Sequence, residues 1–236
     1  MNYITIQLGF VATTFIVYFL LFTQFQKGLK KSNFPLDKKK RIYRNTLIVL
    51  IVWTVLISTL SLSGLLSDFS TLPPRQLIVL AVPLVCIPWA ISTKTAKEIF
   101  KHIPAYRLIY LQSFRIIVEI LLWMLFLESL VPVQMTFEGR NFDVLSGLSA
   151  PIVGYFVHQQ RISKLFCVAW NLVCLGLLLN IVTTAILSMP TPLRAFMNEP
   201  ANTIVAKFPI VWLPGLLVPM AYGLHLASLR QLLTKK

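Results

Sequence analysis

The stretch LFCVAWNLVCLGLLLNIVTTAILS, residues 165–188, decides the fold of this chain. It contains no Asp, Glu, Lys or Arg over 24 residues. A helix of about 20 apolar residues spans the hydrocarbon core of a bilayer and satisfies its own backbone hydrogen bonds there. The stretch therefore predicts a transmembrane helix.

The rest of the chain has the same character. Of its 236 residues, 56% are hydrophobic and only 13% are charged, and the mean hydropathy is +0.74. An ordinary soluble domain carries about 25% charged residues. The connections between apolar runs are also too short to hold a soluble domain. We predict one all-α, polytopic integral membrane domain that covers residues 1–236.

Apolar runs between charged or proline-rich breaks predict a bundle of seven transmembrane helices. The first run lies in an N-terminal sequence, MNYITIQLGFVATTF, that lacks the positive segment and the cleavage site of a secretory signal peptide, so we expect it to be retained. The expected helices cover residues 4–25, 45–66, 76–93, 108–131, 142–158, 165–188 and 208–229.

Lysine and arginine are distributed unevenly between the two sides of such a bundle. Of the 22 basic residues, 17 fall in segments 26–44, 94–107 and 159–164 and in the C-terminal tail, which includes Lys235 and Lys236. The other side receives only Arg75, Arg140, Arg194 and Lys207. Because basic loops stay in the cytoplasm, we expect the N-terminus outside and the C-terminus in the cytoplasm. The membrane is expected to be the bacterial inner membrane.

The net charge of +14 does not indicate nucleic-acid binding, because the basic residues lie in short segments between spans. The lipid bilayer is the expected partner. Residues 27–44 could bind anionic lipid head groups, at about 1 kcal/mol per basic residue near the surface. A topology signal would explain the same basic residues. The sequence does not identify a protein partner.

The fourth expected helix contains LQSFRIIVEILLW, residues 111–123. At about 100° per residue, Gln112, Arg115 and Glu119 share one side of this helix, and Glu119 lies about 18 Å beyond the cytoplasmic end, near the bilayer centre. A charge at that depth costs about 2.5–3.5 kcal/mol. Arg115 and Glu119 are therefore expected to neutralise each other as an i, i+4 pair that faces the bundle interior. The stripe is either a ligand, ion or proton site or a structural pair.

A second polar cluster follows in MTFEGRNFDVLSGLSAPIVGYFVH, residues 135–158. Asn141 is expected to cap the fifth helix, with Asp143 near its positive N-terminal end. Glu138 and Arg140 lie in the same turn and, with Asp143, are candidates for the outer mouth of a binding site. Three residues are secondary candidates for ligand contacts: Asn141, Asn180 and His158.

The sequence lacks the motifs of several common sites. The last span has no mid-helix lysine for a retinal Schiff base, and no Gly-rich phosphate loop, His-Glu-x-x-His or Gly-x-Ser-x-Gly occurs. His102, His158 and His225 lack the close spacing of zinc or di-iron ligands. We expect them near the cytoplasmic ends of spans or in a cytoplasmic loop. We expect no metal site and no cofactor.

Three functions remain open. A transporter or channel-like protein for a small polar solute, an ion or a proton would use Gln112, Arg115 and Glu119 as a midplane site. A membrane sensor or assembly factor would bind a partner without transport. An intramembrane enzyme acting on a lipid would use Glu119, Glu138 or Asp143 as acid or base. The missing nucleophile–base pair favours a role that is not enzymatic.

Overall fold

The computed structural model describes residues 2–234, and every regular element in that range is helical. The predicted all-α class is confirmed for this range, and Lys235 and Lys236, used in the charge argument, lie outside the described residues. The α-helices are α1 (Tyr3–Lys31), α2 (Leu36–Leu62), α3 (Gln76–Ser92), α4 (Lys94–Lys101), α5 (Ala105–Leu111), α6 (Phe114–Leu127), α7 (Val144–His158), α8 (Lys164–Leu187) and α9 (Val218–Thr234). The short turns are the 3-10 elements η1 (Leu65–Ser67), η2 (Val133–Met135) and η3 (Ile204–Ala206) and the π-helical turn η4 (Leu213–Leu217).

Several of these helices are long and apolar enough to cross a membrane. By length and composition they are Tyr3–Lys31, Leu36–Leu62, Ala105–Leu127 and Lys164–Leu187. The helices α3 and α4 meet at a bend of 73° and would together make a fifth crossing. This finding supports a membrane protein with four or five such helices among residues 2–234. The sixth and seventh spans and the direction of the chain stay predictions.

Two expected helices are interrupted. The run 108–131 is divided into α5 and α6 at Gln112 and Ser113, where backbone bonds of the i→i−3 type replace the regular ladder. It ends at Leu127 instead of residue 131, because the chain turns through Ser129 at φ 54° before Pro132.

The expected run 208–229 becomes η4 followed by α9. Pro219 has no N–H, so the carbonyl of Gly215 lacks its helical donor, and Trp53 Nε1 donates to that oxygen at 2.9 Å. A tryptophan of α2 thereby satisfies a carbonyl that a proline leaves free.

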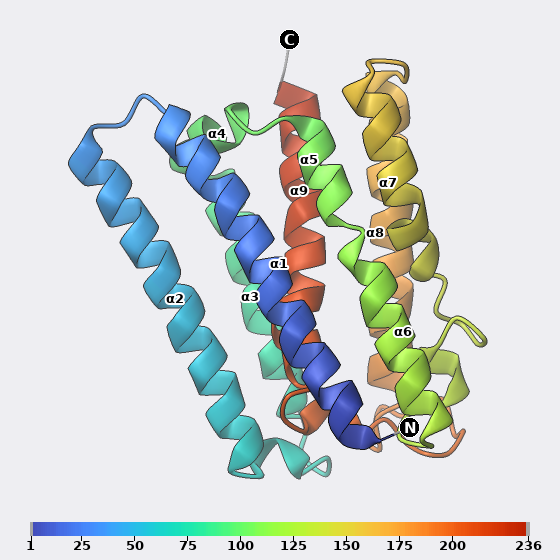
Figure 1. Cartoon of the computed structure of the whole chain (residues 1–236). Coiled ribbons are helices and arrows are strands. Elements are labelled where there is room, and N and C mark those ends of the chain that lie inside the picture. Colours follow the sequence, from blue (N-terminus) through green and yellow to red (C-terminus); the bar gives the residue numbers. More distant parts are fainter. Residues whose placement is uncertain (1, 235–236) are drawn as a thin grey trace.

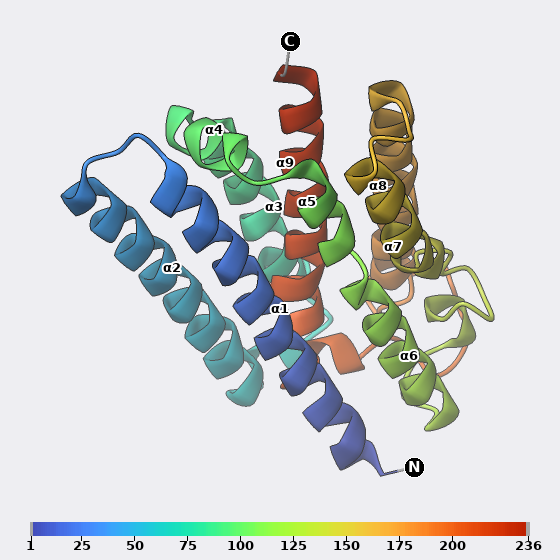
Figure 2. The ribbon, with the colours of Figure 1, turned by 45° about the horizontal axis from the view of Figure 1, so that its top comes forward.

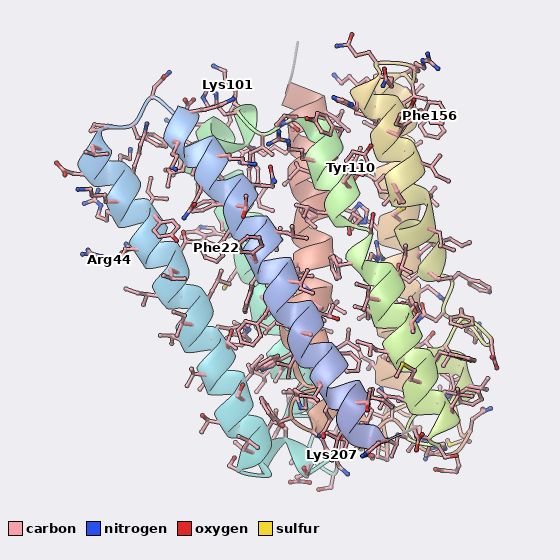
Figure 3. All side chains as sticks on the ribbon, viewed as in Figure 1. Phe22, Arg44, Lys101, Tyr110, Phe156 and Lys207 are labelled. Atoms are coloured by element: carbon pink, nitrogen blue, oxygen red, sulfur yellow. The ribbon has the colours of Figure 1, made fainter. Side chains whose placement is uncertain are left out.

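Helix α9 lies in the middle of the bundle, as Figures 1 and 2 show, and packs against α3, α5 and α8. Helix α1 packs along α6, while α2 runs at the edge of the bundle. Large apolar side chains of α2, such as Val49 and Val52, are more than half exposed and present a face suited to lipid. Lys101 and Lys207 lie at opposite ends of the molecule (Figure 3).

The connection between α6 and α7 is folded into the bundle. Helix α7 has 15 residues, a length of about 22 Å. In the segment 129–143 that precedes it, Val131, Met135 and Asn141 are buried. This arrangement brings the start of α7 inside the bundle.

The close approach of α7 to α6 depends on Gly147. A Cβ at this position would lie 2.9 Å from the backbone nitrogen of Ile116 and 3.0 Å from its Cγ1. A backbone atom cannot move aside as a side-chain end can. Gly147 therefore sets the distance between the two helices.

We expect Gly147→Val to lower the free energy of unfolding by about 1–3 kcal/mol, because the added methyl groups would force α7 away from α6. Thermal unfolding in detergent measures the change. Gly176→Ala is the matched control, because a Cβ at Gly176 meets no atom within 4 Å. Equal stability of the Gly147→Val variant and the unchanged protein would contradict the assigned helix contact.

Candidate functional site

Arg115 lies at the centre of the buried polar groups. It comes from the first turn of α6, is 2% exposed, and forms a bidentate ion pair with Asp143 at the start of α7. Arg115 Nε donates to Asp143 Oδ2 at 2.7 Å, and Nη2 donates to Oδ1. Two parallel charge-assisted hydrogen bonds hold both side chains in one orientation. The inward fold of residues 129–143 makes this pair possible.

His225 of α9 continues the chain of contacts. Arg115 Nη1 lies 2.9 Å from His225 Nε2, and His225 Nδ1 lies 2.9 Å from Asn171 Oδ1. A guanidinium has only donors, so Nε2 must accept, and Nδ1 then carries the proton that it donates to Asn171. Asn171 Nδ2 in turn donates to Ser228 Oγ at 3.2 Å. The contacts therefore define a neutral imidazole in one tautomer.

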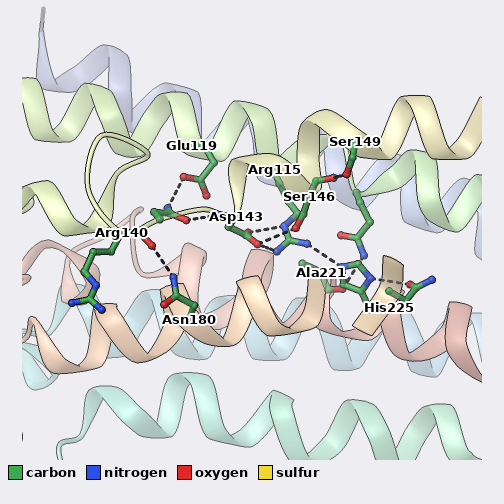
Figure 4. A network of polar contacts seen from close by, with 12 residues as sticks. Arg115, Glu119, Arg140, Asp143, Ser146, Ser149, Asn180, Ala221 and His225 are labelled. Atoms are coloured by element: carbon green, nitrogen blue, oxygen red, sulfur yellow. Dashed lines mark hydrogen bonds and ion pairs between the residues drawn. The ribbon is translucent and has the colours of Figure 1, made fainter. Parts of the chain in front are cut away.

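On the other side, Asn141 links Asp143 to Glu119. Asn141 Oδ1 accepts from the backbone N–H of Asp143 at 3.1 Å, and Asn141 Nδ2 donates to Glu119 Oε2 at 2.5 Å. Figure 4 shows how these side chains join α6, α7 and α9. We call the connected set the polar network: Glu119, Asn141, Asp143, Arg115, His225, Asn171 and Ser228.

Two sequence-based expectations about these residues were wrong. Among the described residues, Arg115 forms its ion pair with Asp143 and not with Glu119, because Asp143 approaches from α7 with bidentate geometry. Asn141 does not cap α7 through its side chain. The side-chain oxygen of Asn141 instead accepts a hydrogen bond from the backbone N–H of Asp143, two residues later. Asp143 occupies the N-cap position of α7, and its own side chain forms no capping hydrogen bond.

The remaining predicted site residues lie at different places. Gln112 is buried beside the network, and its Nε2 donates to the carbonyl of Ala221 at 3.1 Å. Glu138 is exposed and accepts from Trp123 Nε1 at 2.6 Å. Arg140 is also exposed, with its guanidinium 5.1 Å from the ring centre of Phe196. The structure does not bring Glu138 and Arg140 into the network.

The two other secondary candidates lie outside the network as well. Asn180 of α8 donates to the backbone carbonyl of Arg140 at 2.7 Å, as Figure 4 shows, and so holds the α6–α7 connection against α8. His158 is exposed at the end of α7, with its ring 4.4 Å from that of Tyr106.

His225 and Asn171 belong to the network although sequence reasoning did not include them among the candidates. His225 was expected at the cytoplasmic end of a span, but it is fully buried. The sequence does contain a signal for His225, because polar residues recur every three positions along α9, at His225, Ser228 and Gln231. Such a polar stripe in an apolar helix indicates a face that turns inward.

A cavity of about 90 Å³ lies next to one end of the network. Glu119, Arg115 and Asp143 contribute to its wall, which is otherwise mainly apolar and comes from α3, α6, α8 and the segment 202–221. Because Arg115 and Asp143 neutralise each other, Glu119 is the carboxylate on this wall without an ion pair among the described residues. Space of this size holds on the order of six water molecules.

The loop between α8 and η3 closes one end of this cavity. Met189 and Asn202 of the loop line the cavity, and Asn202 Nδ2 donates to the carbonyl of Ala185 at 3.0 Å. Arg194 braces the loop by donating to Glu199 at 2.9 Å, and this hydrogen bond lowers the pKa of the Glu199 carboxyl.

These features describe a helical protein in which several helices are long and apolar enough to cross a membrane, and a buried charged network lies beside an internal cavity. Residues 72–233 match the family described as "Domain of unknown function (DUF8737)", and because the match covers more than half of the chain, the protein belongs to this family. All residues of the polar network lie in the matched range. Comparison with curated proteins found no match. Comparison with solved structures found none either.

We expect Asp143→Asn to lower the free energy of unfolding by about 3–5 kcal/mol, because it leaves the buried Arg115 charge without its counter-charge. The double variant Arg115→Met with Asp143→Leu should lose much less than the sum of the losses in the single variants Arg115→Met and Asp143→Leu. Thermal unfolding in detergent measures both effects.

Glu199→Gln is the matched control, since it removes the exposed ion pair with Arg194 and should change stability little. If the two single losses at Arg115 and Asp143 simply add in the double variant, the buried pair does not act as a unit.

Proposed function

We propose that this chain is an integral protein of the bacterial inner membrane with seven spans, an outer N-terminus and a cytoplasmic C-terminus. The spans are α1, α2, α3, α5 with α6, α7, α8, and η4 with α9. We further propose that it transports protons, or a small solute whose movement is coupled to that of protons, through the polar network. The proposed orientation is supported by the alternation along the chain between connections rich in lysine and arginine and connections with few of them.

The position of Glu119 carries the transport proposal. This carboxylate lies where the cavity meets the polar network, so it contacts both a space that can hold a solute and a chain of hydrogen-bonding groups. Ionisable groups inside membrane spans commonly belong to ion pathways or proton relays. Glu119 is therefore the proposed group that binds and releases the transported proton.

The rest of the network supports a carrier rather than an open channel. Arg115 lies between Glu119 and His225, and its two-bond pairing with Asp143 keeps the guanidinium in place. A fixed arginine in a narrow polar path opposes the passage of cations and protons. Transfer past this point requires Arg115 to change partners. We propose that such a rearrangement alternates the access of Glu119 between the two sides.

The continuation toward the cytoplasm follows α9. Ser228 lies three residues beyond His225, and Gln231 three residues further, on the same face of the helix. Gln231 donates to the carbonyl of Phe100 at 2.9 Å, next to the connection between α4 and α5. This row of polar groups would connect the network to the cytoplasmic side.

The proposed topology predicts which positions a membrane-impermeant thiol reagent reaches in intact cells. In a variant whose three cysteines are replaced by serine, Asn198→Cys should react from outside, and Lys38→Cys should react only after the membrane is opened. Labelling by a maleimide reagent, detected on a gel, measures both. The reverse pattern would contradict the orientation, and equal labelling of both from outside would contradict seven spans.

We expect Glu119→Gln to reduce proton flux to the level of protein-free liposomes. The amide keeps the shape and the bond from Asn141 but cannot exchange a proton at physiological pH. The measurement is the internal pH of proteoliposomes that hold a fluorescent pH dye, after a potential is imposed with potassium and valinomycin. Glu138→Gln is the matched control, since Glu138 is an exposed carboxylate outside the network.

Unchanged flux in a folded Glu119→Gln variant would contradict the transport proposal. That outcome would favour the alternative of a membrane sensor or assembly factor, in which the network only fixes helix packing. Lipid turnover that depends on Glu119 would instead favour the alternative of an intramembrane enzyme.

A further inference from the structure

Two residues that line the cavity beside Glu119 carry hydrogen-bond acceptors that have no donor. Six buried side-chain oxygens of the described residues lack a partner, and two of them belong to residues that line this cavity. They are Gln76 Oε1, in the first turn of α3, and Asn202 Oδ1, in the loop before η3. A buried acceptor without a donor costs free energy, so these two oxygens indicate a missing donor.

The orientation of both amides is fixed by their other ends. Gln76 Nε2 donates to the carbonyls of Leu66 and Asp68, and Asn202 Nδ2 donates to the carbonyl of Ala185 at 3.0 Å. Turning either amide around would place oxygen against oxygen. The free atoms in this cavity are therefore acceptors and cannot be exchanged for donors.

Glu119 adds a carboxyl group, which can carry a negative charge, to the wall of the same cavity. Its hydrogen bond from Asn141 uses Oε2, and it has no ion pair among the described residues, while the charge of Arg115 is taken by Asp143. A carboxylate together with two carbonyl-type oxygens suits a group that is positively charged and donates hydrogen bonds.

The apolar wall distinguishes between kinds of cation. Inorganic cations such as Ca²⁺ and Mg²⁺ require about six or more oxygen ligands, and the wall here is formed mainly by side chains such as Leu80, Val118 and Ile181. An alkyl group gains from contact with such a wall. The volume of about 90 Å³ limits the ligand to a few heavy atoms beyond its nitrogen.

We propose that the cavity binds a small protonated amine with an apolar body, with its ammonium group on Glu119 and its N–H groups shared with Gln76 and Asn202. This inference rests on the proposed transport function and names its substrate class: a small alkylammonium ion that exchanges with the proton on Glu119.

The test uses the purified full-length protein in detergent and compares three probes of similar size, n-butylammonium, 1-butanol and n-butyrate, with the sodium ion. Isothermal titration calorimetry measures each dissociation constant. We expect saturable binding of n-butylammonium, binding of 1-butanol that is weaker by roughly tenfold or more, and no binding of n-butyrate. This comparison needs no variant, so it stays informative whichever substitutions fold.

Variants then locate the site. Glu119→Gln should weaken n-butylammonium binding by roughly tenfold or more, and Asn202→Leu by a smaller factor. Glu138→Gln should leave it unchanged. Equal affinity for n-butylammonium and 1-butanol, full binding in the Glu119→Gln variant, or saturable binding of sodium that displaces the amine would each overturn the proposal.

The two proposals fail in different ways. If proteoliposomes show proton flux that depends on Glu119 but n-butylammonium neither binds nor alters that flux, the amine inference is wrong and proton transport stands. If n-butylammonium binds through Glu119 but neither it nor protons cross the membrane, the binding site stands and the transport proposal is wrong.

Discussion

The interior of this protein depends on the ion pair between Arg115 and Asp143. Moving a charged side chain from water into a bundle of apolar helices costs free energy. An ion pair with a single opposite charge recovers this cost only when the geometry of the pair is good. Here the guanidinium forms two bonds to one carboxylate and a third to His225. This requirement explains several features that are otherwise unrelated: the short α7, the inward fold of residues 129–143, and the close contact at Gly147.

The pair also determines what its neighbours can do. Because Asp143 neutralises Arg115, Glu119 is left with only a neutral donor, Asn141. Because Arg115 offers only donors, His225 must be neutral and must point its other nitrogen at Asn171. A change of partner at Arg115 would therefore alter the charge felt by Glu119 and the protonation of His225 together. Two groups on opposite sides of one arginine are coupled in this way without touching each other.

Sequence reasoning located the long apolar helices, because each of them is one continuous stretch of apolar residues in the sequence. It placed Arg115 and Glu119 inside the bundle for the same reason, since depth and side of a helix follow from spacing alone. It misassigned the partner of Arg115, because Asp143 is 28 residues away in the chain and reaches Arg115 only through the fold of a loop. Helix ends were also misplaced: α1 continues through Lys31, since lysine ends an apolar run without ending a helix.

Gln76 and Asn202 show the limit of that reasoning most clearly. Both lie at positions that hydropathy assigns to the ends of helices or to a connection, where polar side chains normally meet water. Their donors are instead used by backbone carbonyls of neighbouring turns, and their oxygens are buried without a donor. No pattern in the sequence distinguishes such an oxygen from a solvated one. Only the tertiary packing distinguishes them, because Leu66 and Asp68 hold the amide of Gln76 and Ala185 of α8 holds that of Asn202. The proposed chemistry of a ligand therefore comes from the structure, whereas the sequence indicates only charged residues in an apolar helix.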